Sequence, residues 1–168
     1  MFREISAKEI KDNAASLFDD DWGLLTSGET ACYNTMTISW GTLGELWNRD
    51  ICTVFVRPQR YTYEFMEKND CFTVSFFPKG YRKALSFCGA KSGRDYDKAK
   101  ETGLTAFDTG YGAAFEQAKL IVCCRKLYKQ DLSQDGFIDR SILGECYPKN
   151  DLHRLYIGEV LKVLVKEQ

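Results

Sequence analysis

The sequence predicts a mainly β protein, a β-barrel decorated with short helices. Two observations support this fold class. Six segments have the composition and alternation of strands, and the helical segments between them are short and do not follow every strand. A doubly wound α/β sheet would need a helix after nearly every strand, so it does not fit. The length of 168 residues suits one domain, which we expect to cover residues 1–168.

The strand candidates are rich in β-branched and aromatic residues. Residues 34–40 alternate in polarity, and residues 72–77 do so again, whereas residues 51–56 are continuously apolar, as in a strand covered on both faces. Gly158 interrupts the last strand and predicts a bulge or a close backbone approach. The six predicted strands are residues 22–26, 34–40, 51–56, 72–77, 118–130 and 153–166.

The helix candidates are marked by their ends. Ser6 and Glu9 form a capping box, which predicts a short helix to about Ala15. Residues 62–68 carry Glu64 and Lys68 at the supportive spacing of four. Residues 83–87 suit a single turn, and residues 95–102 start with acidic residues and stop at Gly103, a typical C-terminal cap.

Charge and cysteine usage exclude several classes of function. The formal net charge is −1, so no global attraction to nucleic acid or to an acidic membrane is expected. No segment approaches the roughly 20 apolar residues of a membrane span, and the charged N-terminus does not resemble a signal peptide. We therefore expect a cytoplasmic protein. Its seven cysteines form no Cys-x-x-Cys pair, and most are expected to be small buried apolar residues rather than metal ligands.

The segment 34–41 carries a row of hydroxyls. Thr35, Thr37 and Ser39 share one face of the predicted strand, and Met36 and Trp40 share the other. Such a row suits a flat heterocycle with several edge donors and acceptors. The alternative is the solvent-facing side of an amphipathic strand.

The segment 56–62 combines two arginines with a helix start. Pro58 cannot donate a ladder hydrogen bond, so the strand should finish near Arg57. A helix then begins near Thr62 and offers free amides and the positive end of its dipole. With Arg60, these groups form a candidate phosphate site. Two solvated arginines beside a helix cap are the alternative.

The segment 88–95 is a glycine-containing basic loop. Lys91, Ser92 and Arg94 can face an anion, and Gly93 permits unusual backbone angles. It is not a P-loop, because that motif needs a glycine-rich stretch before Gly-Lys-Ser, and Ala90 precedes Lys91 here. Either a mobile loop over a ligand phosphate or an ordinary basic surface loop fits.

No hydrolytic constellation is present. A nucleophilic cysteine would need a histidine base, and His153 is the single histidine of the chain. We expect His153 to be structural or to contact a second subunit, with a share in substrate or cofactor contact as the alternative. Trp40 and Trp47 flank a glycine-containing turn and are candidate walls of a pocket.

These segments, in this order and spacing, resemble the flavin reductase-like proteins with an FMN-binding split barrel, and most closely the flavoredoxin-type branch. The residues that carry the resemblance are 34–41, 56–62, 70–77, 88–95 and 153–160. The resemblance implies a six-stranded antiparallel Greek-key split barrel and a homodimer with FMN near the subunit interface.

The resemblance also assigns residues to the cofactor. The strand at residues 34–41 would contact the flavin and its ribityl chain. Residues 57–62 would serve the phosphate end or the adjoining wall, and residues 91–94 would complete the phosphate site. Cys88 and Gly89 would approach the cofactor through their backbone. The predicted FMN-binding residues are Thr35, Met36, Thr37, Ser39, Trp40, Arg57, Arg60, Tyr61, Thr62, Cys88, Gly89, Lys91, Ser92, Gly93 and Arg94.

The implied activity is electron transfer between NAD(P)H, the bound flavin and an acceptor. The flavin performs the redox chemistry, so no catalytic side chain is needed. No Gly-x-Gly-x-x-Gly fingerprint precedes a helix, and NAD(P)H would bind without a Rossmann unit. Two alternatives stay open: an FMN electron-transfer protein that docks a redox partner without using NAD(P)H, and a flavin-free binding or scaffold barrel.

Overall fold

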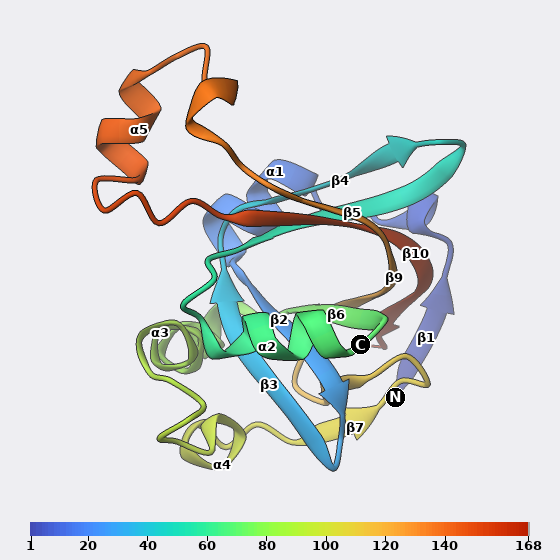
Figure 1. The fold of residues 1–168 in the computed structure, drawn as a ribbon. Helices are drawn as coiled ribbons and strands as arrows, with labels where there is room; N and C mark the ends of the chain where they lie inside the picture. The colour runs from blue at the N-terminus through green and yellow to red at the C-terminus, as the bar shows by residue number, and fades with distance from the viewer. Residues whose placement is uncertain (168) are drawn as a thin grey trace.

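A curled antiparallel sheet dominates the structure, a computed structural model that describes residues 1–167 (Figure 1). The sheet has eight strands in the order β3-β2-β6-β9-β10-β5-β4, and β1 pairs with β10 outside this path. A separate hairpin is formed by β7 and β8. The strands are β1 (Phe2–Ile5), β2 (Gly23–Glu29), β3 (Cys32–Ile38), β4 (Gly41–Leu46), β5 (Arg49–Val56), β6 (Cys71–Phe76), β7 (Ala106–Asp108), β8 (Ala113–Phe115), β9 (Leu120–Asp131) and β10 (Arg154–Lys166).

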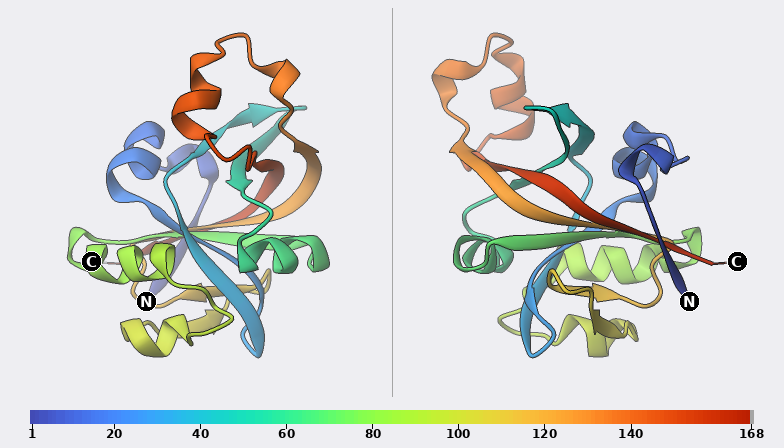
Figure 2. Two further views of the ribbon diagram at one scale, coloured as in Figure 1. Left: turned by 60° about the vertical axis from the view of Figure 1, so that its left-hand side comes forward. Right: turned by 90° about the vertical axis from the view of Figure 1, so that its right-hand side faces the viewer.

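The sheet encloses an apolar core and leaves one gap. Phe72, Val122 and Tyr156 come from three neighbouring strands and are fully buried inside the curve. The edge strands β3 and β4 follow each other in the chain but do not pair with each other. The barrel is therefore split at the short link formed by Ser39 and Trp40, which confirms the predicted fold class (Figures 1 and 2).

The strand number differs from the predicted six. The missed strand β4 contains two glycines and lacks a long apolar run, so its pattern is weak. Its hairpin with β5 turns at Trp47 and Asn48, both with φ of 58°. Two positive φ values are typical of a type I′ turn, which usually carries Asn-Gly, so Trp-Asn gives no clear signal. The shorter β1, β7 and β8 were also missed.

The predicted N-terminal helix is wrong beyond its first turn. The capping box forms, but it starts only the 3₁₀ turn Ala7–Glu9. Ile10 then takes extended angles, and Asn13 caps a new start for α1 (Ala14–Ser16), which runs into a π-helical turn at Leu17–Asp21. Ser6 and Asn13 each cap a short helical turn, and extended backbone separates the two turns, so no continuous helix forms.

Two further helices pack beside strands β2 and β3, and a third packs against the second of them. They are α2 (Tyr61–Lys68), α3 (Arg82–Ala90) and α4 (Lys98–Thr102), which is capped by Asp97 and ends at Gly103. The expected single turn at residues 83–87 is thus a longer helix. None of the helices in residues 1–167 is long and apolar enough to cross a membrane.

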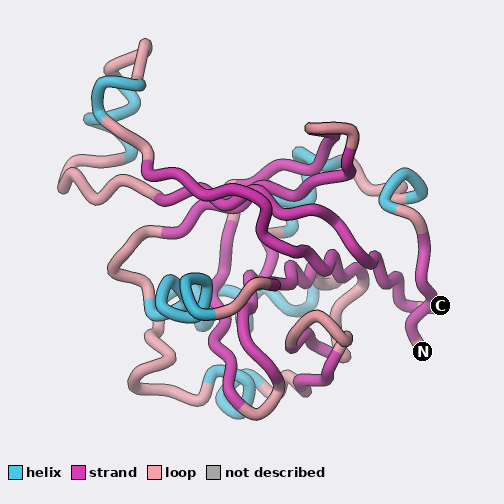
Figure 3. Tube along the Cα trace, turned by 45° about the vertical axis from the view of Figure 1, so that its right-hand side comes forward, coloured by secondary structure: helices cyan, strands magenta, loops and turns pink. Residues whose placement is uncertain are grey.

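Two long strands carry the chain to its end. β9 and β10 confirm the predicted strands, and their link, residues 132–153, projects from the barrel with α5 (Ser141–Cys146) (Figure 2). The pairing of β9 with β10 shifts register at Gly158, as expected. A Cβ there would lie 2.6 Å from the Phe72 ring. The N-terminal strand β1 lies beside the end of β10, with which it pairs (Figure 3).

All seven cysteines lie within residues 1–167 and are free thiols. Cys52, Cys88, Cys123 and Cys124 are buried, which confirms the expectation for most of them. Burial raises the pKa of the Cys88 thiol to about 11, so it is not a reactive thiolate at neutral pH.

Candidate functional site

A pocket opens at the split in the barrel, where β3 and β5 end. It combines aromatic and aliphatic walls with two guanidinium groups. Its volume is about 170 Å³, smaller than the roughly 300–1,000 Å³ of most ligand pockets. The lining residues are Met36, Thr37, Ile38, Ser39, Trp40, Phe55, Arg57, Arg60 and His153.

The hydroxyl row of β3 is partly used by the fold itself. The Thr35 hydroxyl lies 2.9 Å from that of Thr26 and donates to the Leu25 carbonyl, and Thr35 is outside the pocket. The Thr37 hydroxyl donates to the Leu85 carbonyl of α3, although Thr37 also lines the pocket. Ser39 is exposed, so its hydroxyl is accessible at the pocket wall.

An aromatic group forms one side of the pocket. Trp40 is 44% exposed, and its ring lies 5.2 Å from that of His153. The Tyr147 hydroxyl is 2.8 Å from His153 Nδ1, which fixes the imidazole against the projecting segment 132–153. Burial, then the charge of Arg57, lowers the pKa of His153 to about 4, so the imidazole is neutral at physiological pH.

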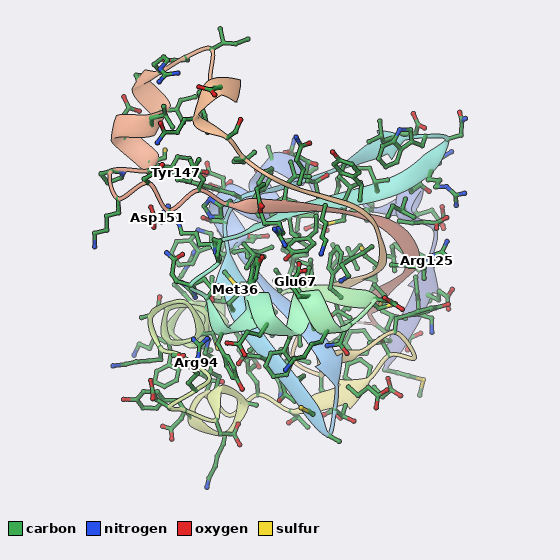
Figure 4. All side chains as sticks on the ribbon, in the orientation of Figure 1. Met36, Glu67, Arg94, Arg125, Tyr147 and Asp151 are labelled. Atoms are coloured by element: carbon green, nitrogen blue, oxygen red, sulfur yellow. The ribbon has the colours of Figure 1, made fainter. Side chains whose placement is uncertain are left out.

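Arg57 anchors the base of the projecting segment. It forms an ion pair with the Asp151 carboxylate at 2.5 Å and donates to the Cys146 carbonyl at 3.0 Å. Its guanidinium also lies 5.1 Å from the centre of the Tyr147 ring. Figure 4 shows Tyr147 and Asp151 together at the base of this segment. The charge of Arg57 is thus already balanced by an acidic partner.

Arg60 lies in the same pocket and has no such partner. Within residues 1–167, no carboxylate oxygen lies within 4 Å of its guanidinium, and it donates one hydrogen bond, to the Gly89 carbonyl at 2.9 Å. Burial, then the charge of Arg57, lowers the pKa of Arg60. The residue also occupies the N-cap of α2, whose first turn has no side-chain cap. The site therefore has an unbalanced cation beside the positive end of a helix.

The basic loop lies against the start of α2. Arg94 stacks at 4.5 Å on the Tyr61 ring and pairs with Glu64 (Figure 4 labels Arg94). Gly93 approaches Asn34 so closely that a Cβ would lie 1.9 Å from the amide oxygen. The Asn34 amide in turn donates to the Thr62 hydroxyl at 2.8 Å.

The structure thus sorts the predicted residues into three groups. Met36, Thr37, Ser39, Trp40, Arg57 and Arg60 come together in the pocket. Tyr61 begins α2, and Gly93 and Arg94 of the basic loop lie against its ring. Of the other two loop residues, Lys91 lies near the Tyr96 ring and Ser92 accepts a hydrogen bond from the Arg94 amide. Thr35, Thr62 and Cys88 are buried and Gly89 is half-buried, and the polar groups of all four are bonded within the fold.

Several pocket residues were not among those predicted. His153 was expected to be structural or to contact a second subunit, with substrate or cofactor contact as the alternative; it lines the pocket and also bonds Tyr147. Ile38 and Phe55 lie in apolar strand patterns and carried no signal. Trp47 packs on Tyr128 at the β4–β5 turn and is not among the residues that line this pocket.

Comparison with solved structures shows the same fold in other proteins. Flavoredoxin from Methanosarcina acetivorans is 22% identical, with a TM-score of 0.68 over 88% of this chain and 69% of that one. An FMN-binding protein from Thermus thermophilus is 20% identical (TM-score 0.67; 98% and 82% covered). An NADH:FAD oxidoreductase from Streptomyces globisporus is 15% identical (TM-score 0.65; 87% and 74% covered).

Comparison with sequences gives one family. No curated protein matches the chain. The model of the flavin reductase like domain matches residues 18–168, which is nearly the whole length. This range contains the split barrel apart from β1, together with the pocket and the basic loop. The chain belongs to the flavin reductase-like domain family.

Proposed function

We propose that the protein is an FMN-binding oxidoreductase of the flavin reductase or flavoredoxin type. It would transfer electrons between NAD(P)H, bound flavin and an acceptor. The observation that carries the proposal is the pairing of an exposed aromatic wall at Trp40 with the carboxylate-free guanidinium of Arg60. A flat ring bearing a phosphate matches both features, and family membership supports the same ligand.

The residues divide by the chemistry of their groups. Met36, Trp40 and Phe55 offer apolar and aromatic surface for the isoalloxazine ring, and the Ser39 hydroxyl can bond its edge. Arg60 and the uncapped start of α2 suit the phosphate. The adjoining loop, with Lys91, Ser92, Gly93 and Arg94, would complete this end. When bound, FMN supplies the chemistry of accepting and passing on electrons.

The side chains of the pocket bind and orient rather than transfer protons. His153 is neutral at physiological pH, and Tyr147 holds its imidazole in one orientation. His153 therefore presents a neutral ring beside Trp40 and adds no charge to the site. Arg57 keeps the segment 132–153 close to the pocket through Asp151.

We also propose that the protein works as a homodimer. The pocket of a single chain, about 170 Å³, encloses only part of a ligand as large as FMN. A second copy would supply the missing wall. Size-exclusion chromatography with light scattering tests this: a mass of two chains in the presence of FMN is expected, and a mass of one chain would contradict it.

The activity is tested by reconstitution and anaerobic reduction. The full chain is purified, loaded with FMN and mixed with NADH or NADPH without oxygen. We expect bleaching of the flavin absorbance faster than that of free FMN with at least one nicotinamide. Bleaching only at the free-flavin rate would refute the reductase assignment and leave an electron-transfer protein that uses a redox partner. A protein that takes up no FMN would favour a flavin-free barrel.

A further inference from the structure

Two cations, the buried Lys98 and the half-buried Arg60, meet the C-terminal end of α3. The ammonium of Lys98, on α4, donates to the Cys88 carbonyl at 2.8 Å and to the Thr35 carbonyl at 2.7 Å. The guanidinium of Arg60 donates to the next carbonyl of α3, that of Gly89. Two successive carbonyl groups at this helix end therefore accept hydrogen bonds from two cations, Lys98 and Arg60, which come from different elements.

Lys98 is unusually placed for a lysine. The residue is 5% exposed, and within residues 1–167 no carboxylate lies within 4 Å of its ammonium. Buried cations are normally paired with an acidic group. Here the balance comes from two carbonyls and from the negative end of the α3 dipole.

The two cations are close enough to influence each other. Burial lowers the pKa of Lys98 to about 8, and the charge of Arg60 contributes to this shift. Most Lys98 side chains are still charged at neutral pH. The carbonyl oxygens at the end of α3 thus accept hydrogen bonds from two positively charged groups. One of these groups, the Arg60 guanidinium, lies in the pocket. An anion bound at Arg60 would relieve this excess of positive charge.

We infer that Lys98 is a positioning residue for the phosphate end of the flavin site. By occupying the Cys88 carbonyl, it leaves the Gly89 carbonyl to orient Arg60, and by bonding Thr35 it joins the end of α3 to β3. Arg60 uses one of its five N–H groups in this contact, and within residues 1–167 the others have no hydrogen-bond partner and can face a phosphate. The inference rests on the proposed function, because it assumes that the bound group carries a phosphate.

The experiment compares two flavins that differ only in the phosphate. Dissociation constants of FMN and riboflavin are measured by fluorescence titration of the full chain, for wild type and for Lys98→Met. We expect FMN to bind roughly tenfold more weakly, as for a lost charge-assisted contact, and riboflavin to change by about twofold at most. The matched control is Lys100→Met, an exposed lysine of the same helix, which should change neither constant.

A double-mutant cycle tests whether Lys98 acts through Arg60. In an Arg60→Met background, Lys98→Met should weaken FMN binding little further, because the group that it positions is gone. Full additivity of the two losses would overturn the inference. So would equal losses for FMN and riboflavin, or a lowered melting temperature with unchanged FMN affinity.

A second variant covers the case in which Lys98→Met does not fold. Lys98→Gln replaces the ammonium with a neutral amide that is one atom nearer the backbone and is not expected to reach both carbonyls, so it should show the same loss for FMN alone. If neither variant folds, Lys98 serves the fold as a whole and the inference fails. Failure of the proposed function looks different, since wild type itself would then bind no flavin.

Discussion

Arg60→Met separates recognition of the phosphate from recognition of the ring. The substitution keeps an apolar stem in the pocket and removes the guanidinium that has no carboxylate partner in the described chain. A charge-assisted hydrogen bond contributes about 1.5–3 kcal/mol. At 1.4 kcal/mol for each factor of ten, FMN affinity should fall by about 10- to 150-fold.

Riboflavin provides the internal comparison, because it has the same ring without the phosphate. Its affinity for Arg60→Met should stay within about twofold of wild type, because the substitution removes no polar contact with riboflavin. Both ligands are measured by quenching of flavin fluorescence at equal ionic strength. Equal losses for FMN and riboflavin, or none for either, would refute the assignment of Arg60 to the phosphate.

Arg57→Met is the matched control in the same pocket. Arg57 is already paired with Asp151 and bonded to the Cys146 carbonyl, so its loss should release the segment 132–153 and change both affinities alike. From the sequence, Arg57 and Arg60 were equal candidates for the phosphate. If Arg57→Met alone selectively lost FMN binding, Arg57 rather than Arg60 would be the residue that binds the phosphate.

Two further predictions concern stability. Gly158→Ala places a Cβ 2.6 Å from the Phe72 ring and should lower the free energy of unfolding by about 1–3 kcal/mol in urea denaturation. The control Gly44→Ala has nothing within 4 Å of its Cβ and should leave the free energy of unfolding unchanged. Equal effects of the two substitutions would contradict the close packing at Gly158. Because the pKa of His153 in the folded protein is about 4, below the 6.5 that is usual for a histidine, its contribution to stability should be complete above pH 6.5 and lost as the pH falls towards 4. Urea midpoints of wild type and His153→Gln should therefore converge over this range, and a constant difference would show that the imidazole does not titrate as described.

The sequence was most informative where periodicity decides burial. The alternation of residues 34–40 predicted β3, and Met36 and Ile38 do face the core. The same alternation could not reveal that Thr35 and Thr37 bond to Leu25 and Leu85, since those partners come from other elements. A hydroxyl row was therefore visible, but its accessibility was not.

The charged residues show the same limit. The sequence of segment 56–62 predicted two arginines at a helix start. Only the fold distinguishes Arg57, which pairs with Asp151, from Arg60, which has no acidic partner in the described chain. Asp151 is 94 residues away in sequence from Arg57. Lys98 belongs to a polar-looking helix, and its burial depends on β3 and α3 packing around it. Long-range pairing of this kind leaves no local pattern.

The most direct measurement is a crystal structure of the full chain grown with excess FMN. The ring should lie against Trp40 and His153, and the phosphate should lie within hydrogen-bond distance of the Arg60 guanidinium. Density for FMN on another surface, or a phosphate that contacts other cations while Arg60 keeps no ligand contact, would contradict the site described above.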